Sequence, residues 1–298
     1  MKTLRLLGLT SALVLIVGAC GATVTPGPTA TGQPSATAEP TPTGATAAPT
    51  PTGPIARAIA APVAAITVDG DPSDWAAVPG LEVALEGIEG VEVPVESKQA
   101  TVKVAHDDRF VYVLFEVQDD YDWSAEDAHL SASSAVMWAV QTAAGPHMGP
   151  DDAKGEGPSL GMVDIWHWEL ECAAGEQTGG EVSEPGADSD PGNDSACNFD
   201  DEWATGPKDR EDDNADAAEN SLLGVWSHTN ATANGAGTWV FEIRRPLQTG
   251  DAQDAQFAAG APSLLALAYW DADQTPSGWE DDGHSQSSNE GWIEVTLD

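Results

Sequence analysis

Short runs in which hydrophobic and polar residues alternate recur along most of the chain and predict β-strands. In the clearest run, Val111, Val113, Phe115 and Val117 fall at every second position, so they share one face of an extended strand. The predicted strands cover residues 65–68, 101–105, 109–117, 134–141, 162–170, 222–228, 238–244, 264–271 and 292–297. Because no long amphipathic helix pattern alternates with these strands, the fold class predicted is all-β, a β-sandwich.

One stretch, residues 173–220, breaks the alternation and is rich in Asp, Glu, Gly, Asn and Ser. We interpret it as a long acidic loop insertion in the sandwich. Its densest run, Asp-Ser-Asp-Pro-Gly-Asn-Asp at 188–194, offers the oxygen ligands that Ca²⁺ prefers. The glycine and asparagine do not fall at the offsets of an EF-hand loop, so a solvated acidic loop is the preferred interpretation.

The first twenty residues have the pattern of a bacterial lipoprotein signal peptide. Lys2 and Arg5 precede an apolar run over residues 6–17, and the run ends in Val-Gly-Ala-Cys at Cys20. The run is too short to span a membrane comfortably. We therefore expect export and lipidation of Cys20, with the protein anchored to the outer face of the cytoplasmic membrane or to the cell envelope. An ordinary signal peptide cleaved elsewhere is the alternative.

Composition divides the rest of the chain into a tether and a domain. Residues 21–60 are dominated by Pro, Thr, Ala and Gly, with almost no charge or aromatic side chains. Such a segment cannot bury enough apolar surface to offset its ordering entropy, so a disordered tether is predicted. Residues 61–298 are expected to form one β-sandwich domain.

Charge and cysteine content narrow the range of partners. The chain has 49 acidic and 11 basic residues and a formal net charge of -38, which argues against nucleic acid or anionic lipid as a ligand. Besides Cys20 there are only Cys172 and Cys197, and outside the cytoplasm these two are expected to form a disulfide. No Cys-x-x-Cys-His motif occurs, so any haem would be bound non-covalently.

A catalytic function is not predicted. Residues 157–161 match Gly-x-Ser-x-Gly, but a nucleophile elbow needs a strand before the serine and a helix after it. Here a polar loop comes first and a predicted strand follows. The chain also lacks a His-Glu-x-x-His motif and a phosphate-binding loop, and its six histidines are dispersed.

Two strands carry candidate ligand-binding side chains. Alternation puts Trp166 and Trp168 on one face and His167 on the other, so the indoles form either a flat wall for a planar ligand or an ordinary core pair. Met137 shares its face with Ala135 and Ala139. A thioether with such small neighbours either fills a gap in the core or serves as a soft axial ligand to haem iron.

His284 is a third candidate. It follows Asp-Asp-Gly in a predicted loop before the last strand, where a side chain is exposed and adaptable. Taken alone, the position is equally typical of a surface histidine.

Five segments occur in an order that resembles the ethylbenzene-dehydrogenase-type haem-binding domain, the gamma subunit of periplasmic type II molybdenum enzymes of the dimethyl-sulfoxide-reductase family. They are residues 66–75, 134–139, 163–168, 239–247 and 268–271. Asp-Ile-Trp-His-Trp and Arg-Arg-Pro-Leu are the more specific runs, whereas Asp-Gly-x-x-x-Asp-Trp is shared with carbohydrate-binding sandwiches. The resemblance implies a β-sandwich with haem b at one end, its iron held by a methionine and a lysine.

The resemblance also implies site residues. Met137 matches the methionine ligand, and His284 falls near the position of the lysine, which this chain lacks, so Met/His ligation is implied. The haem pocket would be lined by Trp138, Trp166 and Trp168. Competing ligands are His167 and the pair His147 and Met148.

The expected function is therefore that of an extracytoplasmic electron-transfer lipoprotein that binds haem b and catalyses nothing. Its redox partner would be a molybdenum oxidoreductase or another cytochrome. The main alternative is a carbohydrate-binding sandwich of the family-9-like type, with Trp166 and Trp168 as the sugar platform. A third possibility is a scaffold lipoprotein that has lost its ligand.

Overall fold

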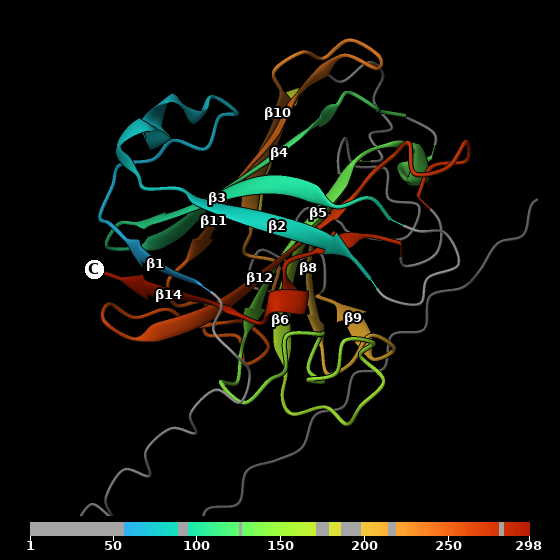
Figure 1. The fold of residues 1–298 in the computed structure, drawn as a ribbon. Coiled ribbons are helices and arrows are strands. Elements are labelled where there is room, and N and C mark those ends of the chain that lie inside the picture. Colours follow the sequence, from blue (N-terminus) through green and yellow to red (C-terminus); the bar gives the residue numbers. More distant parts are fainter. Residues whose placement is uncertain are drawn as a thin grey trace, which may run out of the picture. The chain divides into compact units, whose positions relative to one another are not determined.

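A computed structural model describes residues 57–88, 95–124, 127–170, 179–185, 198–213, 219–279 and 283–298. Two mostly antiparallel sheets pack face to face, which confirms the predicted all-β sandwich (Figure 1). The first sheet, named here the β4 sheet, runs in the order β7 (Gly179–Ser183), β10 (Leu223–His228), β11 (Ala236–Pro246), β4 (Phe110–Asp120), β3 (Lys98–His106) and β2 (Leu81–Gly87).

The second sheet, named here the β5 sheet, runs in the order β9 (Arg210–Asp212), β8 (Asn198–Ala204), β6 (Val163–Glu169), β5 (Ser133–Ala139), β12 (Pro262–Trp270) and β14 (Ile293–Leu297). The short β13 (Ser285–Gln286) pairs with both β12 and β2 and so links the two sheets. Three short 3-10 helices complete the described structure: η1 (Pro72–Ala77), η2 (Ala128–Leu130) and η3 (Ser288–Glu290).

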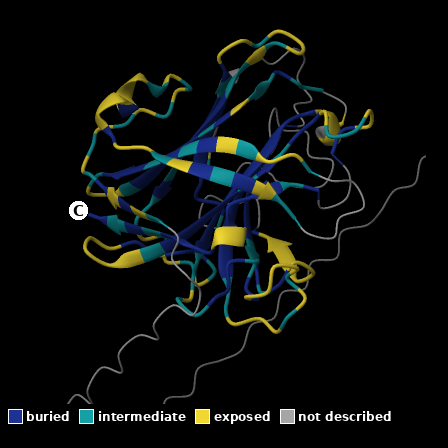
Figure 2. Ribbon diagram, in the orientation of Figure 1, coloured by how far each residue is buried: buried dark blue, intermediate teal, exposed yellow. Residues whose placement is uncertain are grey.

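The main core lies between the sheets, where buried residues gather (Figure 2). It contains five buried tryptophans: Trp138, Trp166, Trp168, Trp226 and Trp239. Trp166 and Trp168 are fully buried there, and Trp168 stacks on Phe199 with ring centroids 4.1 Å apart. Gly224 lies against this pair: a Cβ at that position would come within 2.6 Å of Phe199, so the stack requires glycine. Removing one such ring from water contributes on the order of 4 kcal/mol.

A buried ionic cluster joins the two sheets at one end of the core. Arg245 on β11 donates two hydrogen bonds to Asp164 on β6, at 2.8 and 2.7 Å, and one to Asp201 on β8, at 2.7 Å. It also forms an ion pair with Asp254. Burial raises the pKa of Asp164 to about 6 and that of Asp201 well above its ordinary value, and the guanidinium opposes both shifts.

The acidic segment 173–220 is more than a loop, which corrects the prediction. It supplies β7 to the β4 sheet, and β8 and β9 to the β5 sheet. Asp200, Asp201 and Glu202 on β8 are all buried. The solvated run at 188–194 and the proposed disulfide between Cys172 and Cys197 lie outside the described residues, as do Cys20 and the signal peptide.

The N-terminal boundary also differs from the prediction. β1 (Arg57–Ala61) begins inside the segment predicted as tether, because it pairs in parallel with β14 over five residues. The segment at residues 65–68 does not form the predicted strand; the nearest pairing is an isolated bridge between Val63 and His106. The side chains of this segment instead pack with Trp75 over the outer face of the β4 sheet.

Candidate functional site

A pocket of about 240 Å³ opens on the outer face of the β5 sheet, the face turned away from the main core. Its floor comes from β5, β6 and β12: Ala135, Met137, Ile165, Ala266 and Ala268. The strand register sets Ala268, Ala135 and His167 in one row and Ala266, Met137 and Ile165 in the next. Three alanines on neighbouring strands leave the depth that larger side chains would fill.

The loop between β5 and β6 forms one wall and contributes His147, Met148, Lys154 and Gly155. It folds tightly, since Gly145 and Gly149 bridge to each other and Trp292 Nε1 donates to the Ala144 carbonyl at 3.0 Å. A Cβ on Gly145 would lie 1.9 Å from the Pro150 carbonyl oxygen, so this turn requires glycine.

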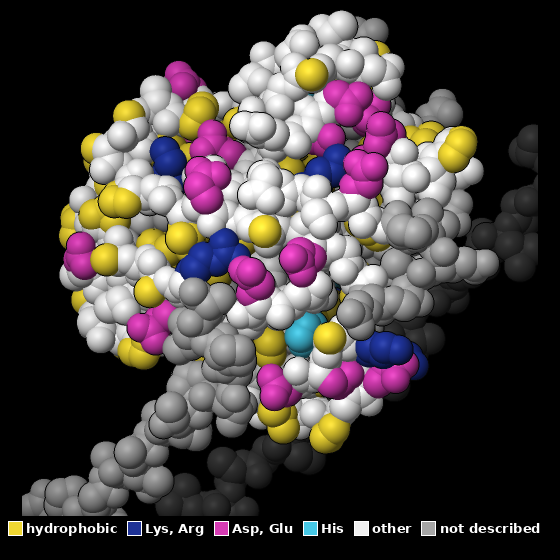
Figure 3. Space-filling view, viewed as in Figure 1, with side chains coloured by type: hydrophobic (Ala, Val, Ile, Leu, Met, Phe, Trp, Pro, Cys, Tyr) yellow, Lys and Arg dark blue, Asp and Glu magenta, His cyan; other side chains and the backbone are white. Residues whose placement is uncertain are grey.

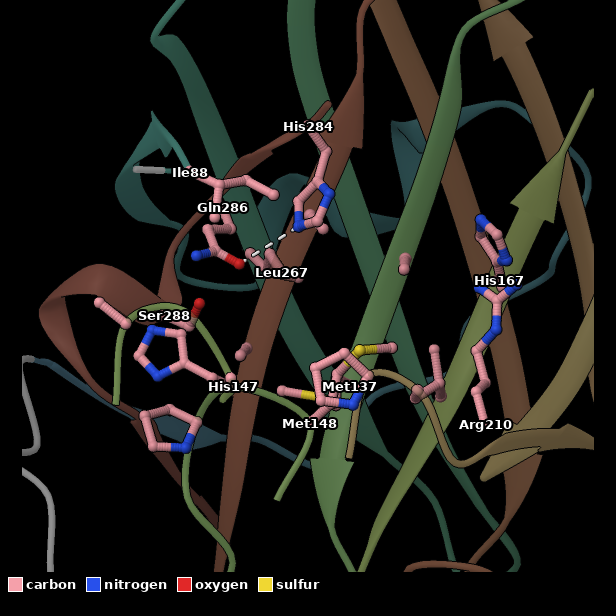
Figure 4. Close-up of a pocket in the computed structure, with 18 of the residues that line it drawn as sticks. Ile88, Met137, His147, Met148, His167, Arg210, Leu267, His284, Gln286 and Ser288 are labelled. Carbon is pink, nitrogen blue, oxygen red and sulfur yellow. Dashed lines mark hydrogen bonds between the residues drawn. The ribbon is translucent and has the colours of Figure 1, made fainter. Parts of the chain in front are cut away.

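Trp270 is the aromatic centre of the pocket. The side chain is half-buried at the end of β12 and lies between two imidazoles, with ring centroids 5.0 Å from His167 and 4.6 Å from His284. In Figure 4, His167 and Arg210 lie on one side of the pocket, His284 and Gln286 on the other, and Met137 and Met148 between them. The indole of Trp270 therefore packs against one imidazole from β6 and another from the segment just before β13.

Polar groups surround this ring. His284 Nε2 and Gln286 Oε1 are 3.2 Å apart, and Gln286 Nε2 donates to Asn289 Oδ1 at 2.8 Å. Burial lowers the pKa of His147, so its imidazole is neutral near pH 7. The pocket therefore combines an apolar floor with donors and acceptors along its rim.

His167 also has polar contacts through both ring nitrogens. Its Nε2 lies 3.3 Å from Ser133 Oγ, and its Nδ1 lies 3.3 Å from Glu202 Oε1. Arg210 Nε lies 3.6 Å from Glu202 Oε2. The order Ser, His, Glu matches that of a nucleophilic triad. Ser133 is fully buried, however, and its hydroxyl donates to the Trp168 carbonyl, so it cannot attack a substrate.

The structure brings several predicted residues together. Met137, His284 and the competing candidates His147, Met148 and His167 all line the pocket. The predicted pocket tryptophans do not: Trp138, Trp166 and Trp168 are fully buried in the core between the sheets. Of the two alternatives that alternation left open for Trp166 and Trp168, the core pair is therefore the one that forms, because that face of β6 packs against the β4 sheet.

Sequence reasoning missed Trp270, Gln286 and Arg210, which also line the pocket. Alternation along β12 contained a usable signal: Ala266, Ala268 and Trp270 fall on one face, and the two alanines leave the indole accessible. Arg210 lies on β9, in the segment interpreted as a loop.

The surface around the sandwich is polar and acidic. On the face shown in Figure 3, acidic side chains are scattered among hydrophobic and basic ones rather than merged into one patch. Among the described residues, none of the helices has the length and apolar character needed to cross a membrane.

No protein-family model matches the chain, and no curated protein does. Solved structures with a similar fold include a Bacteroides uniformis protein with a provisional carbohydrate-binding description, at 7% identity and TM-score 0.48, covering 81% of this chain and 99% of that one. A family 9 carbohydrate-binding module from Caldicellulosiruptor kristjanssonii in complex with cellotriose has 13% identity and TM-score 0.43, covering 81% and 93%. A family 9 carbohydrate-binding module from the same organism in complex with glucose has 12% identity and a TM-score of 0.40, and the match covers 81% of this chain and 96% of that one.

These findings correct the predicted resemblance. The similar structures are carbohydrate-binding proteins and not haem-binding gamma subunits, so the predicted membership of that family is wrong, and so is the haem-binding, electron-transfer function that it implied. At these identities the likeness concerns the fold alone. The absence of Trp138, Trp166 and Trp168 from the pocket agrees with the correction, since a bound haem would lack the predicted aromatic walls.

Proposed function

We propose that this chain is an exported, lipid-anchored binding protein whose pocket beside Trp270 takes a small carbohydrate. The observation that carries the proposal is the half-buried indole held between His167 and His284. One face of a sugar ring consists of C–H groups and packs well on an aromatic ring, whereas its hydroxyls need hydrogen bonds around the edge. An aromatic ring beside polar side chains meets both needs.

The rim of the pocket supplies those hydrogen bonds. Gln286 and His284 offer amide and imidazole groups on one side, and Arg210 offers a guanidinium on the other. The floor of alanines is apolar and contributes shape rather than polarity. A volume of about 240 Å³ is slightly below the range of typical small-molecule pockets, which begins at roughly 300 Å³, so a single ring or a chain end fits better than a long polymer.

The proposed role is binding without catalysis. The Ser133, His167 and Glu202 arrangement has a nucleophile that donates its proton elsewhere, and the Gly-x-Ser-x-Gly serine at 159 lies in an exposed loop. The signal peptide and the Thr/Pro/Ala-rich segment would hold the domain outside the cytoplasmic membrane, where it meets soluble or cell-wall sugars.

The test is a titration of the purified protein with glucose, cellobiose, xylose and N-acetylglucosamine, followed by calorimetry and by tryptophan fluorescence. Trp270→Ala should abolish binding of the sugar that the parent takes. Trp203→Ala is the matched control, since that tryptophan is also half-buried but does not line the pocket. Failure of every sugar to bind the parent, or unchanged affinity in Trp270→Ala, would contradict the proposal.

A further inference from the structure

Next to the pocket, three buried side chains with metal-binding atoms meet on two neighbouring strands. His167 on β6 is directly opposite Asp200 on β8, and Glu202 lies two residues further along the same face. One ligand atom from each lies within 4.8 Å of the other two. The exposed fractions of the three residues are 3%, 1% and 3%. The cluster is thus a compact set of one nitrogen and two carboxylates, closed off from bulk water.

The hydrogen bonds around His167 determine where its ring proton lies. The Ser133 hydroxyl donates to the Trp168 carbonyl, so its oxygen is left to accept a hydrogen bond from His167 Nε2–H at 3.3 Å. In the neutral imidazole Nδ1 then carries a lone pair. That lone pair faces Glu202 Oε1, another acceptor, at 3.3 Å. Two hydrogen-bond acceptors repel each other at this distance. The contact between Nδ1 and Oε1 is therefore favourable only if the imidazole carries a second proton or a cation lies between the two atoms.

The separation of these two atoms fits a metal ion. Ligands about 2.0–2.1 Å from a tetrahedral Zn²⁺ stand about 3.3 Å from one another. A charge-assisted hydrogen bond between the same atoms would be shorter, about 2.7–2.9 Å. Glu202 Oε2 accepts no hydrogen bond among the described residues, and the guanidinium of Arg210, at 3.6 Å, belongs to a side chain that is 42% exposed.

We propose that His167, Asp200 and Glu202 bind a divalent transition-metal ion of the Zn²⁺ class beside the pocket. One imidazole and two carboxylates suit Zn²⁺ or Mn²⁺, whereas Ca²⁺ and Mg²⁺ take oxygen ligands. Ser133 is a positioning residue, because its hydrogen bond to Nε2 fixes the tautomer that presents Nδ1 to the metal. The proposal rests on this cluster alone and does not depend on the identity of the pocket ligand.

The experiment uses the full purified chain, stripped of metal with a chelator and titrated by calorimetry with Zn²⁺, Mn²⁺ and Ca²⁺ separately. We expect one Zn²⁺ per chain, weaker Mn²⁺ binding and no Ca²⁺ binding at this site. Replacement by Co²⁺ should give the visible absorption of a tetrahedral centre. Ser133→Ala should weaken Zn²⁺ binding about tenfold, because losing a residue that hydrogen-bonds a metal ligand typically lowers metal affinity by roughly 10- to 100-fold.

Removing a metal ligand itself should have a larger effect. We expect Zn²⁺ binding to weaken by more than about 100-fold in each of the variants His167→Ala, Asp200→Asn and Glu202→Gln. His129→Ala is the matched control: its Nδ1 is 3.0 Å from Asp127, also a histidine and a carboxylate, but both are exposed. A parent that takes up no Zn²⁺, or a Glu202→Gln variant that binds as tightly as the parent, overturns the proposal. If His167→Ala does not fold, the isosteric Glu202→Gln and the Co²⁺ spectrum of the parent still decide.

Discussion

Arg245 and Asp164 form a two-pronged ion pair across the sandwich, with one guanidinium nitrogen 2.8 and 2.7 Å from the two carboxylate oxygens. Both side chains are buried, and they belong to opposite sheets. Asp201 and Asp254 complete the cluster. A single buried arginine therefore supplies the positive charge that faces three buried aspartates.

The first prediction concerns the loss of this one positive charge among three carboxylates. Arg245→Met should destabilise the domain by roughly 3–5 kcal/mol, because it leaves buried carboxylates without their cation. Urea denaturation would measure the loss. Arg244→Met is the control: that neighbouring side chain is half-buried and lies 4.2 Å over the ring of Phe110, so its loss should cost about 1 kcal/mol or less. Equal effects from the two variants would show that the cluster contributes no special stability.

A second prediction concerns pH. Burial raises the pKa of Asp213 to about 7 and that of Asp164 to about 6, both above the ordinary value of 3.8. Between the ordinary value of 3.8 and these raised values the folded chain holds more protons than the unfolded chain, so the free energy of unfolding falls as pH rises from about 4 to about 7. We expect a higher melting temperature at pH 5 than at pH 8.

Asp213→Asn tests which group is responsible. It should reduce the difference between pH 5 and pH 8 by on the order of 1 kcal/mol, because the amide does not titrate. Exposed Asp209→Asn should leave the difference unchanged. A melting temperature that rises steadily from pH 5 to pH 8 would exclude this account.

The predicted disulfide is tested by counting thiols. Glu169 and Asn198 are paired residues of β6 and β8, so the two described strand ends nearest to Cys172 and Cys197 lie side by side. The purified protein, unfolded without reductant, should show no free thiol from this pair. Cys172→Ser should then cost about 3.5 kcal/mol, as expected for a closed loop of this length. Two reactive thiols in the parent would exclude the bond.

The lipid anchor is tested by fractionation. Cys20→Ala should leave the precursor unprocessed or release the protein from the membrane fraction, because the acyl chains would have no attachment site. Ser11→Ala, within the apolar run, is a control that should fractionate like the parent. If Cys20→Ala also fractionates and migrates like the parent, the lipidation hypothesis fails.

How far alternation predicts structure is clear on β5 and β6. It correctly grouped Ala135 with Met137, and it separated Trp166 and Trp168 from His167. It could not tell which face would meet the other sheet, because both faces of β6 are covered. The face of β6 that carries the tryptophans packs in the main core. The pocket lies on the opposite face of the β5 sheet, where small side chains leave space.

The acidic segment shows a second limit. Asp201 falls in the segment interpreted as an acidic loop insertion, yet it is buried against Arg245, which is 44 residues away in the sequence. A run of charged residues is predicted to be exposed when only the local sequence is considered, because the residue that pairs with it in the core lies far away in the chain. For the same reason Glu202 and Asp200 could not be linked to His167 before the pairing of β6 and β8 was established.

The pairing of β1 with β14 has a mechanical consequence. Five residue pairs, from Arg57 with Ile293 to Ala61 with Leu297, run in parallel at the point where the chain enters the sandwich. A pull on the segment ahead of Arg57 acts along these strands, so their hydrogen bonds are loaded in shear and must break together rather than unzip one by one. The entry strand thus resists detachment under tension, as when fluid drags on a domain whose bound ligand is fixed elsewhere.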